Sequence, residues 1–326
     1  MEPLLLSLSE IMISLILLSG LASLLTLKMP VIAAELSTLL QNKCADIFAS
    51  EELHRNLSQS FVCGTPLGNS FDQILFQETG LIHFMVVSGC HLHLLSALIL
   101  APWPQRFRVH PGLKICLLLI LLLYCLMTGF RPPVVRVFVC FLIRELSENF
   151  KWNWDASKVH LASGVLILGL APDWIFNFSF YLSWLASTGF LLAPLCLTYH
   201  RKTKHWREFA KHWLNSLTVQ SLMSVGLLEF SFLSVFLNAI FAPLVAFFIF
   251  PMTLLLMAFP SFAHLADFFW EMVLSALRFF LRFPHPDHLP LQNLDFEKWF
   301  LLWIFLALLQ VAFEILRRYR YQRHYV

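Results

Sequence analysis

Apolar and polar positions along this chain form long blocks instead of alternating residue by residue. Apolar runs of about 17 to 25 residues are separated by short polar loops, and a helix of that length can cross the hydrocarbon of a bilayer. The pattern predicts an all-α fold, a polytopic transmembrane helix bundle of about nine or ten helices, some of them broken. The expected spans lie near residues 11–27, 81–101, 113–129, 133–146, 159–172, 176–198, 213–230, 232–259 and 299–316. A last segment, 261–283, fits either a further span or an amphipathic helix on the membrane surface.

The composition agrees with a membrane protein. Of the 326 residues, 58% are hydrophobic and only 13% are charged, whereas about a quarter of a soluble domain is charged. The net charge of +3 says less than the position of the basic residues. The loop "RKTKHWREFAK" at 201–211 and the C-terminal "RRYRYQRHYV" are rich in Lys and Arg, which favours the cytoplasmic side for both.

The span expected at 81–101 carries several polar groups at membrane depth. A Ser–Gly pair stands in its middle, and imidazoles lie on both sides of that pair. Polar groups are costly in hydrocarbon unless they face protein or water, so this segment is a candidate for a broken helix that lines a transport site. The candidate residues are His83, Ser88, Gly89, His91 and His93.

A second interruption follows at the far end of the next span, where Thr128 and Gly129 precede two prolines. Arg131, Arg136 and Arg144 come after it. A charged side chain near the bilayer centre costs several kcal/mol unless it faces protein or a water-filled cavity. Arg144 can reach the interface, and Arg131 can lie at the mouth of a pore. We expect Arg136 to face the protein interior or a pore, the alternative being that it extends outward to the interface.

We expect the interruptions near residues 88 and 129 to meet around one polar cavity, because their spans are consecutive and joined by a short loop. A third polar stretch, "FNFSFYLSWLASTGFLLAP" at 176–194, places hydroxyl side chains at near-helical spacing. Small hydroxyl residues of this kind allow helices to pack closely and bond to each other.

Two cysteines, Cys44 and Cys63, fall in the segment 28–79, which is on the outer side by alternation of the spans. They either form a disulfide there or remain two unpaired small residues. The sequence contains no G-x-x-x-x-G-K-[ST] phosphate loop. Energy for transport would therefore come from a partner ATPase or from the membrane potential.

Three motifs resemble, in order and spacing, the membrane core of the bacterial competence DNA-uptake permeases, the ComEC family. They are "TGLIHFMVVSGCH" (79–91), "TGFRPPVVR" (128–136) and "PDWIFNFSFYLSWLASTG" (172–189). The resemblance implies an inner-membrane channel that conducts single-stranded DNA into the cytoplasm during natural transformation. It singles out the positions His83, Ser88, Gly89, His91, Thr128, Gly129 and Arg136.

The resemblance implies three regions in this chain. They are a membrane anchor with a short extracytoplasmic segment (1–69), the permease core (70–260), and a C-terminal helix followed by a last span (261–326). The implied location is the bacterial cytoplasmic (inner) membrane, with the C-terminus in the cytoplasm. The expected partners are single-stranded DNA, separate DNA-binding and nuclease proteins, and membrane lipid. A cytoplasmic motor ATPase is expected as well, because the membrane potential opposes inward movement of an anion.

The chain also departs from the family pattern. Family members typically carry a soluble OB-type domain and often a metallo-β-lactamase-like domain, and we expect neither here, hence no nuclease activity, no cofactor and no metal. The string "FPHPDHLP" at 283–290 imitates the end of an H-x-H-x-D-H motif, but Phe283 stands at the first His position.

Other functions remain open at this point. The same broken helices would suit a small-solute or ion transporter, and a degenerate paralogue could keep the fold without transport. An intramembrane enzyme or metal site on Ser88, Cys90, His91 and His93 is disfavoured, because positions 90, 91 and 93 do not share one face of a helix.

Overall fold

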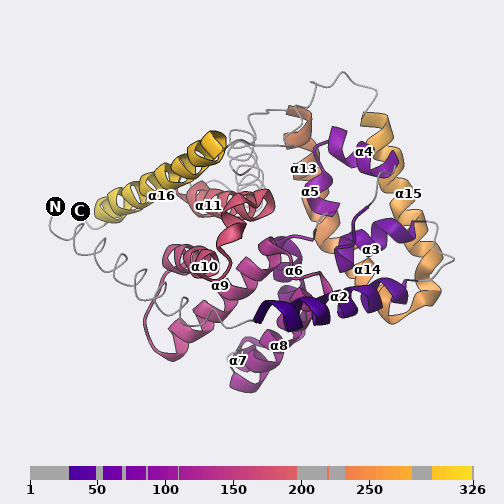
Figure 1. Cartoon of the computed structure of the whole chain (residues 1–326), viewed down its shortest axis with the longest axis horizontal. Helices are drawn as coiled ribbons and strands as arrows, with labels where there is room; N and C mark the ends of the chain where they lie inside the picture. Colours follow the sequence, from indigo (N-terminus) through magenta and orange to yellow (C-terminus); the bar gives the residue numbers. More distant parts are fainter. Residues whose placement is uncertain are drawn as a thin grey trace.

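The computed structural model describes the backbone of residues 29–48, 54–67, 71–85, 87–108, 110–196, 219, 232–280 and 296–324. All regular elements in these ranges are helical, which confirms the predicted all-α class (Figure 1). The span predicted at 11–27, nearly all of the span at 213–230, the basic loop 201–211 and the string 283–290 lie outside the described residues.

The helices follow one another along the chain with mostly short connections. In the first part they are α2 (Met29–Ile47), α3 (Arg55–Cys63), α4 (Phe71–Glu78), α5 (Ile82–Met85), α6 (Gly89–Leu100), α7 (Gln105–Arg108), α8 (Pro111–Met127) and α9 (Pro132–Asn149). The later elements are α10 (Ala156–Leu170), η1 (Pro172–Phe176), α11 (Phe178–Cys196), α13 (Phe232–Leu244), η2 (Val245–Ile249), α14 (Phe250–Ala258), η3 (Pro260–Phe262), α15 (Ala263–Phe280) and α16 (Phe296–His324).

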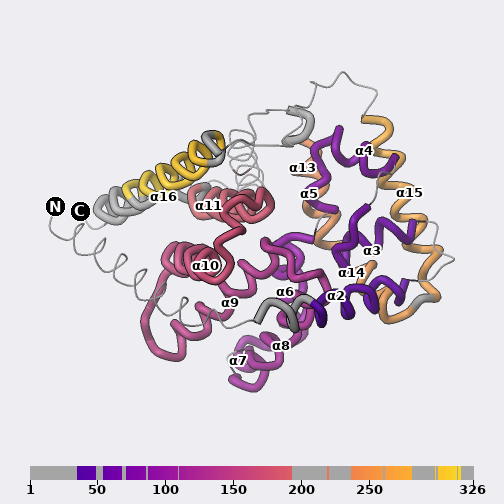
Figure 2. The backbone as a smooth tube through the Cα atoms, viewed as in Figure 1, coloured from indigo at the N-terminus to yellow at the C-terminus, as the bar shows by residue number. Residues whose placement is uncertain are grey.

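These helices form two packed groups that meet at α9 (Figures 1 and 2). One group gathers α2 to α6 and α8 with α13 to α15, and the other gathers α10, α11 and α16. Consecutive residues of α9 join different cores, since Val134 and Val137 pack into the first group and Val135 into the second. Helix α9 therefore lies between the two groups and packs against helices on both of its sides.

The local sequence explains where these helices begin. Ser88 caps α6, and Asp155 caps α10 by accepting a hydrogen bond from the Lys158 amide at 2.9 Å. Prolines occupy the first turns of α8 and α9, where their missing N–H leaves no helical bond unmade. The interruptions seen in the sequence are thus helix ends: α6 begins at a side-chain cap, and α9 begins at two prolines without one.

Two glycines allow the closest approaches between helices. A Cβ atom on Gly89 would lie 2.3 Å from Cγ2 of Val137, and one on Gly164 would lie 2.5 Å from the ring of Trp184. Any side chain at these positions would push α6 away from α9, or α10 away from α11. This close packing of small residues is the kind that polytopic membrane proteins use.

Within the described ranges, one helix is long and apolar enough by itself to cross a membrane. It runs over Phe236–Ala258, 23 residues with a mean hydropathy of 2.4. Shorter apolar helices are found at Gly89–Leu100, Pro111–Met127, Ala156–Leu170, Phe178–Leu192 and Phe300–Phe313. The total of about nine or ten spans stays a prediction.

The segment whose role was left open, 261–283, contains the amphipathic helix α15. Its buried side includes Trp270, whose indole N–H donates to the Ser58 hydroxyl at 2.9 Å. The backbone N–H of His54 donates to the Asp267 carboxylate at 2.9 Å. Helix α15 is therefore docked on α3, with its other side exposed.

Candidate functional site

The predicted interruptions near residues 88 and 129 lie next to each other, and the turn at Gly64 contacts both of them. A Cβ atom on Gly64 would lie 3.0 Å from the carbonyl oxygen of Thr128 and 3.3 Å from a methyl group of Val87. The guanidinium of Arg131 donates to the Gly64 carbonyl at 2.7 Å. We call this meeting point, formed by residues 63–65, 87–89 and 128–131, the junction.

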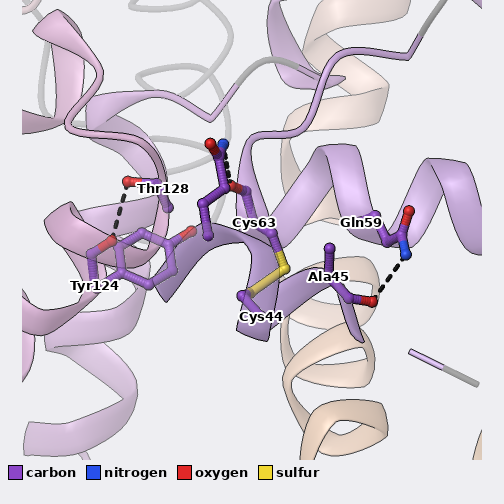
Figure 3. Close-up of a disulfide and its surroundings, with 7 residues drawn as sticks. Cys44, Ala45, Gln59, Cys63, Tyr124 and Thr128 are labelled. Carbon is purple, nitrogen blue, oxygen red and sulfur yellow. Dashed lines mark hydrogen bonds between the residues drawn. A yellow bond between two sulfur atoms is a disulfide. The ribbon is translucent and has the colours of Figure 1, made fainter. Parts of the chain in front are cut away.

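Left-handed backbone makes the turns at the junction possible. Gly64 and Gly129 have φ values of 70° and 76°, which glycine adopts without a Cβ penalty. Phe130 also has a positive φ, 53°. The Thr128 hydroxyl donates back to the Tyr124 carbonyl at 3.0 Å and so closes the end of α8 (Figure 3).

A disulfide holds the junction to α2. Cys44 and Cys63, the two cysteines noted in the sequence, are bonded in the structure (Figure 3). The Gln41 amide donates to the Cys63 carbonyl at 3.0 Å, and the Gln59 amide donates to the Ala45 carbonyl at 2.8 Å. The end of α3 is therefore fixed by one covalent bond and by side-chain hydrogen bonds on both sides of it.

The three imidazoles of the first motif do not come together. His91 is buried in a capping box, where its Nδ1 accepts from the Ser88 amide at 3.1 Å, and its ring lies 4.7 Å from that of Phe61. His83 lies on α5 with its ring 4.4 Å from that of Phe84, and His93 is exposed on the other side of α6. His91 and His93 are two residues apart on one helix, so they point to different faces.

Arg136 is the most enclosed charged residue of the site. Only 1% of it is exposed, and the helices around it supply hydrogen-bond acceptors without charge. Its Nε donates to the Ser183 hydroxyl at 3.1 Å, and Nη2 donates to the Ser183 carbonyl at 2.9 Å and to the Ser187 hydroxyl. Nη1 lies 3.1 Å from Nδ1 of His160 on α10. Within the described ranges, no carboxylate forms an ion pair with this guanidinium.

The hydrogen bonds continue from Arg136 through to α16. Arginine can only donate, so Nδ1 of His160 must accept, and Nε2–H is left to donate to the Thr188 hydroxyl at 3.2 Å. Thr188 also accepts from the Gln310 amide at 2.6 Å. We call these residues, with Ser183 and Ser187, the Arg136 network. It links α9, α10, α11 and α16.

The structure separates two features that the sequence grouped. Gly89 at the junction packs against Val137, the residue that follows Arg136. Neighbouring residues of a helix point about 100° apart, so Arg136 turns toward α10 and α11 while Val137 faces α6. The junction and the Arg136 network therefore lie on different faces of α9.

Sequence reasoning missed two members of the network. His160 is the second residue of the span predicted at 159–172, and an ionisable residue inside a predicted span is a signal of function, although its place at the span end makes that signal weak. Gln310 lies within the last predicted span, where a single amide is also unusual. Ser183, Ser187 and Thr188 belong to the hydroxyl stretch at 176–194, which the sequence predicted to pack and bond between helices, but not to bind Arg136.

The family assignment comes from the comparison with known proteins. The sequence pattern of the competence protein family matches residues 72–319 of this chain. The chain belongs to the competence protein family. The resemblance drawn from the three motifs is thereby confirmed. No solved structure matches the chain.

Individual relatives are distant and longer than the matched part. ComE operon protein 3 of Bacillus subtilis is 26% identical over 236 residues, which are 67% of this chain and 29% of that protein. An uncharacterized protein of Aquifex aeolicus is 29% identical over 215 residues, 64% of this chain and 49% of that protein. A Mycoplasma pneumoniae protein named as an MG316 homolog is 28% identical over 199 residues, 60% of this chain and 50% of that protein. The chain thus matches half or less of the length of each.

The competence match covers the whole Arg136 network. It runs from α4 into α16 and so includes all four helices that contribute to the network. Helix α2 and helix α3, which carry the disulfide, precede the match. Among the residues that the structure describes, no group of three His, Cys, Asp or Glu side chains is arranged to hold a metal ion.

Proposed function

We propose that this competence family member is the inner-membrane channel that conducts single-stranded DNA into the cytoplasm during natural transformation. The observation that carries the proposal is Arg136, a buried guanidinium on α9 with uncharged hydrogen-bond partners. A cation enclosed in this way attracts an anion, and its planar fork of donors suits phosphate oxygens.

The chain crosses the membrane several times in this account. Helix α8 has 17 residues, a rise of about 25 Å, and exposes Ile115, Leu119 and Leu123 along one face. An exposed apolar stripe is unfavourable in water but stable against lipid. The longer of these apolar helices, such as α8, therefore span the bilayer together with Phe236–Ala258, whereas the 12 residues of α6 rise about 18 Å and cross only part of it. The last span also crosses and places the C-terminus in the cytoplasm.

The orientation follows from the disulfide. Disulfides persist on the oxidising side of the membrane, so the junction, which Cys63 adjoins, lies at the outer end of α8 and α9. The opposite end of this helix hairpin, where Lys114 pairs with Glu145 and Glu148 at 2.7 Å, is then the cytoplasmic end. A strand would enter near Arg131 and pass Arg136 on its way inward.

In this proposal the described arrangement is the closed state of the channel, in which neutral acceptors occupy the donors of Arg136. Opening would exchange the hydroxyls of Ser183 and Ser187 for phosphate oxygens. Because phosphate oxygens would replace existing hydrogen-bond acceptors, the net attraction of Arg136 for the strand stays modest. A channel requires such modest attraction, since the strand must be able to leave each site. The membrane potential opposes inward movement of an anion, so a cytoplasmic motor ATPase supplies the energy. Separate proteins supply DNA capture and strand degradation.

Deletion and rescue test the proposal. Cells that lack the chain should lose transformation, and rescue should fail with Arg136→Met, by about 100-fold for a lost interaction of roughly 3 kcal/mol. Arg144→Met is the matched control, since Arg144 lies on the same helix, is exposed and pairs with Glu148 at 3.3 Å. Normal transformation in the deletion strain would overturn the proposal, and equal loss in both variants would remove the specific role of Arg136.

A further inference from the structure

We infer that the loop between α9 and α10 carries a binding platform for single-stranded DNA, on which bases of the emerging strand stack. The platform consists of Phe150, Trp152 and Trp154 in the sequence "NFKWNWD" (149–155). This inference rests on the proposed function, and it adds a binding site at the cytoplasmic exit.

The three rings form one continuous aromatic surface. The rings of Phe150 and Trp152 are stacked, with centroids 5.4 Å apart and planes 17° from parallel. The rings of Trp152 and Trp154 lie 5.2 Å apart. Phe150 is 64% exposed and Trp152 49%, so each can accept a further ring. Trp154 is partly buried against Ile143 and Val159 and anchors the surface to the helices.

The backbone holds this surface in place before any ligand arrives. The Trp152 amide donates to the carbonyl oxygen of Ser147 at 2.9 Å, and the Trp154 amide donates to the Ser147 hydroxyl at 3.0 Å. Lys151 and Asn153 both have positive φ, 57° and 52°, a conformation that residues other than glycine rarely adopt. The polar residues with left-handed backbone alternate with the three aromatic residues, and this backbone conformation keeps the aromatic rings on the same side of the loop. A preformed surface loses little entropy on binding.

Two exposed lysines favour a nucleic acid as the occupant, and the segment 149–158, which also holds Asp155, carries a net charge of +1. Lys151 lies within the loop and Lys158 one turn into α10, and both are exposed. Neither forms an ion pair with the part of the chain that the structure describes. Single-stranded nucleic acid is bound by this combination of aromatic stacking with basic side chains along the backbone, largely independent of base sequence.

A second aromatic and basic pair lies at the same end of the bundle. On α7 the guanidinium of Arg106 sits 5.0 Å over the ring of Phe107. Helix α7 precedes α8, whose first turns pair with the end of α9 through Lys114. At the cytoplasmic end, α7 and the loop between α9 and α10 therefore each place exposed rings beside cations, on the two sides of the α8–α9 hairpin. This arrangement fits a DNA strand that leaves between α7 and the loop.

The test uses the full-length protein in lipid nanodiscs and a fluorescein-labelled oligodeoxythymidylate, with binding followed by anisotropy. Trp152→Leu should weaken binding by about 5-fold to 100-fold, the range for one lost base stack, whereas Trp152→Phe should stay within about threefold. Lys151→Gln should reduce the slope of log affinity against log salt by about 0.7. Phe71→Leu is the control, because Phe71 is likewise an exposed aromatic side chain, at 64% against 49% for Trp152, but lies on α4.

The outcomes separate this inference from the proposed function. The platform is refuted if the wild type does not bind the oligonucleotide, if Trp152→Leu binds as the wild type does, or if Phe71→Leu is equally impaired. Leucine keeps an apolar membrane anchor, so normal binding by Trp152→Leu would make the loop a lipid contact. If Trp152→Leu binds normally and Arg136→Met abolishes transformation, the platform is refuted and the proposed channel is supported. Weakened binding by Trp152→Leu in a chain whose deletion leaves transformation intact would support the platform and refute the channel.

Discussion

Replacing Arg136 by lysine is the conservative change by charge, and we expect it to be more damaging to stability than replacement by methionine. The guanidinium directs hydrogen bonds to Ser183, Ser187 and His160 from three separate nitrogen atoms. The ammonium group of lysine has a single nitrogen atom at a different distance from the backbone, so it cannot donate hydrogen bonds in all three of these directions at once. Lysine would therefore keep a buried positive charge and lose part of its solvation.

The magnitude follows from the bonds that are lost. A hydrogen bond to a charged group contributes about 1.5–3 kcal/mol, so the loss of two bonds by Arg136→Lys costs about 3–6 kcal/mol. Arg136→Met removes the charge with its desolvation penalty, which is several kcal/mol for a buried ion. It leaves mainly Nδ1 of His160 without a donor, at about 1–3 kcal/mol. We expect Arg136→Met to stay within about 2 kcal/mol of the wild type.

Thermal unfolding of the purified protein in one detergent measures this difference. Arg136→Lys should lower Tm by roughly 6 °C or more, and Arg136→Met by less, if a loss of 1 kcal/mol corresponds to about 2–4 °C. Both variants should fail to restore transformation. A Tm for Arg136→Lys equal to that of the wild type would refute the reasoning, because the guanidinium could then not be satisfied through its fork of donors.

Three further changes test separate contacts by the same unfolding assay. Cys63→Ser opens a disulfide that joins residues 19 apart in sequence and should lower the free energy of unfolding by about 3 kcal/mol; reduced wild type should match it. Gly89→Ala should cost about 1–3 kcal/mol by overpacking against Val137, and adding Val137→Ala should recover most of that loss. Gln310→Leu should cost about 1 kcal/mol, and much less when Thr188, its acceptor, is already replaced by valine.

The helical class and the helix ends could be predicted from local sequence. Long apolar blocks predict helices, and Ser88, Asp155 and the prolines of α8 and α9 mark where helices start. These are short-range effects of caps and missing amides, so a sequence carries them directly. The interior position of Arg136 was also predictable, because a charge at membrane depth is costly in lipid.

The arrangement of the site depends on helix rotation, which local sequence does not contain. Arg136 and Val137 are adjacent, yet they face different groups of helices because α9 is covered on both sides. His91 resembled a polar site residue and instead completes the cap of α6. His160 and Gln310 enter the network through contacts between helices that are distant in the chain.

Photo-crosslinking during DNA uptake tests the path of the strand most directly. A photoreactive amino acid placed at position 183, beside Arg136, should trap the labelled incoming strand in competent cells. The same amino acid at position 119, on the exposed face of α8, should react with lipid only. Crosslinks to DNA at position 183 and none at position 119 are the result we predict. Absence of DNA crosslinks at position 183, or equal crosslinks at both positions, would contradict a DNA path past the Arg136 network.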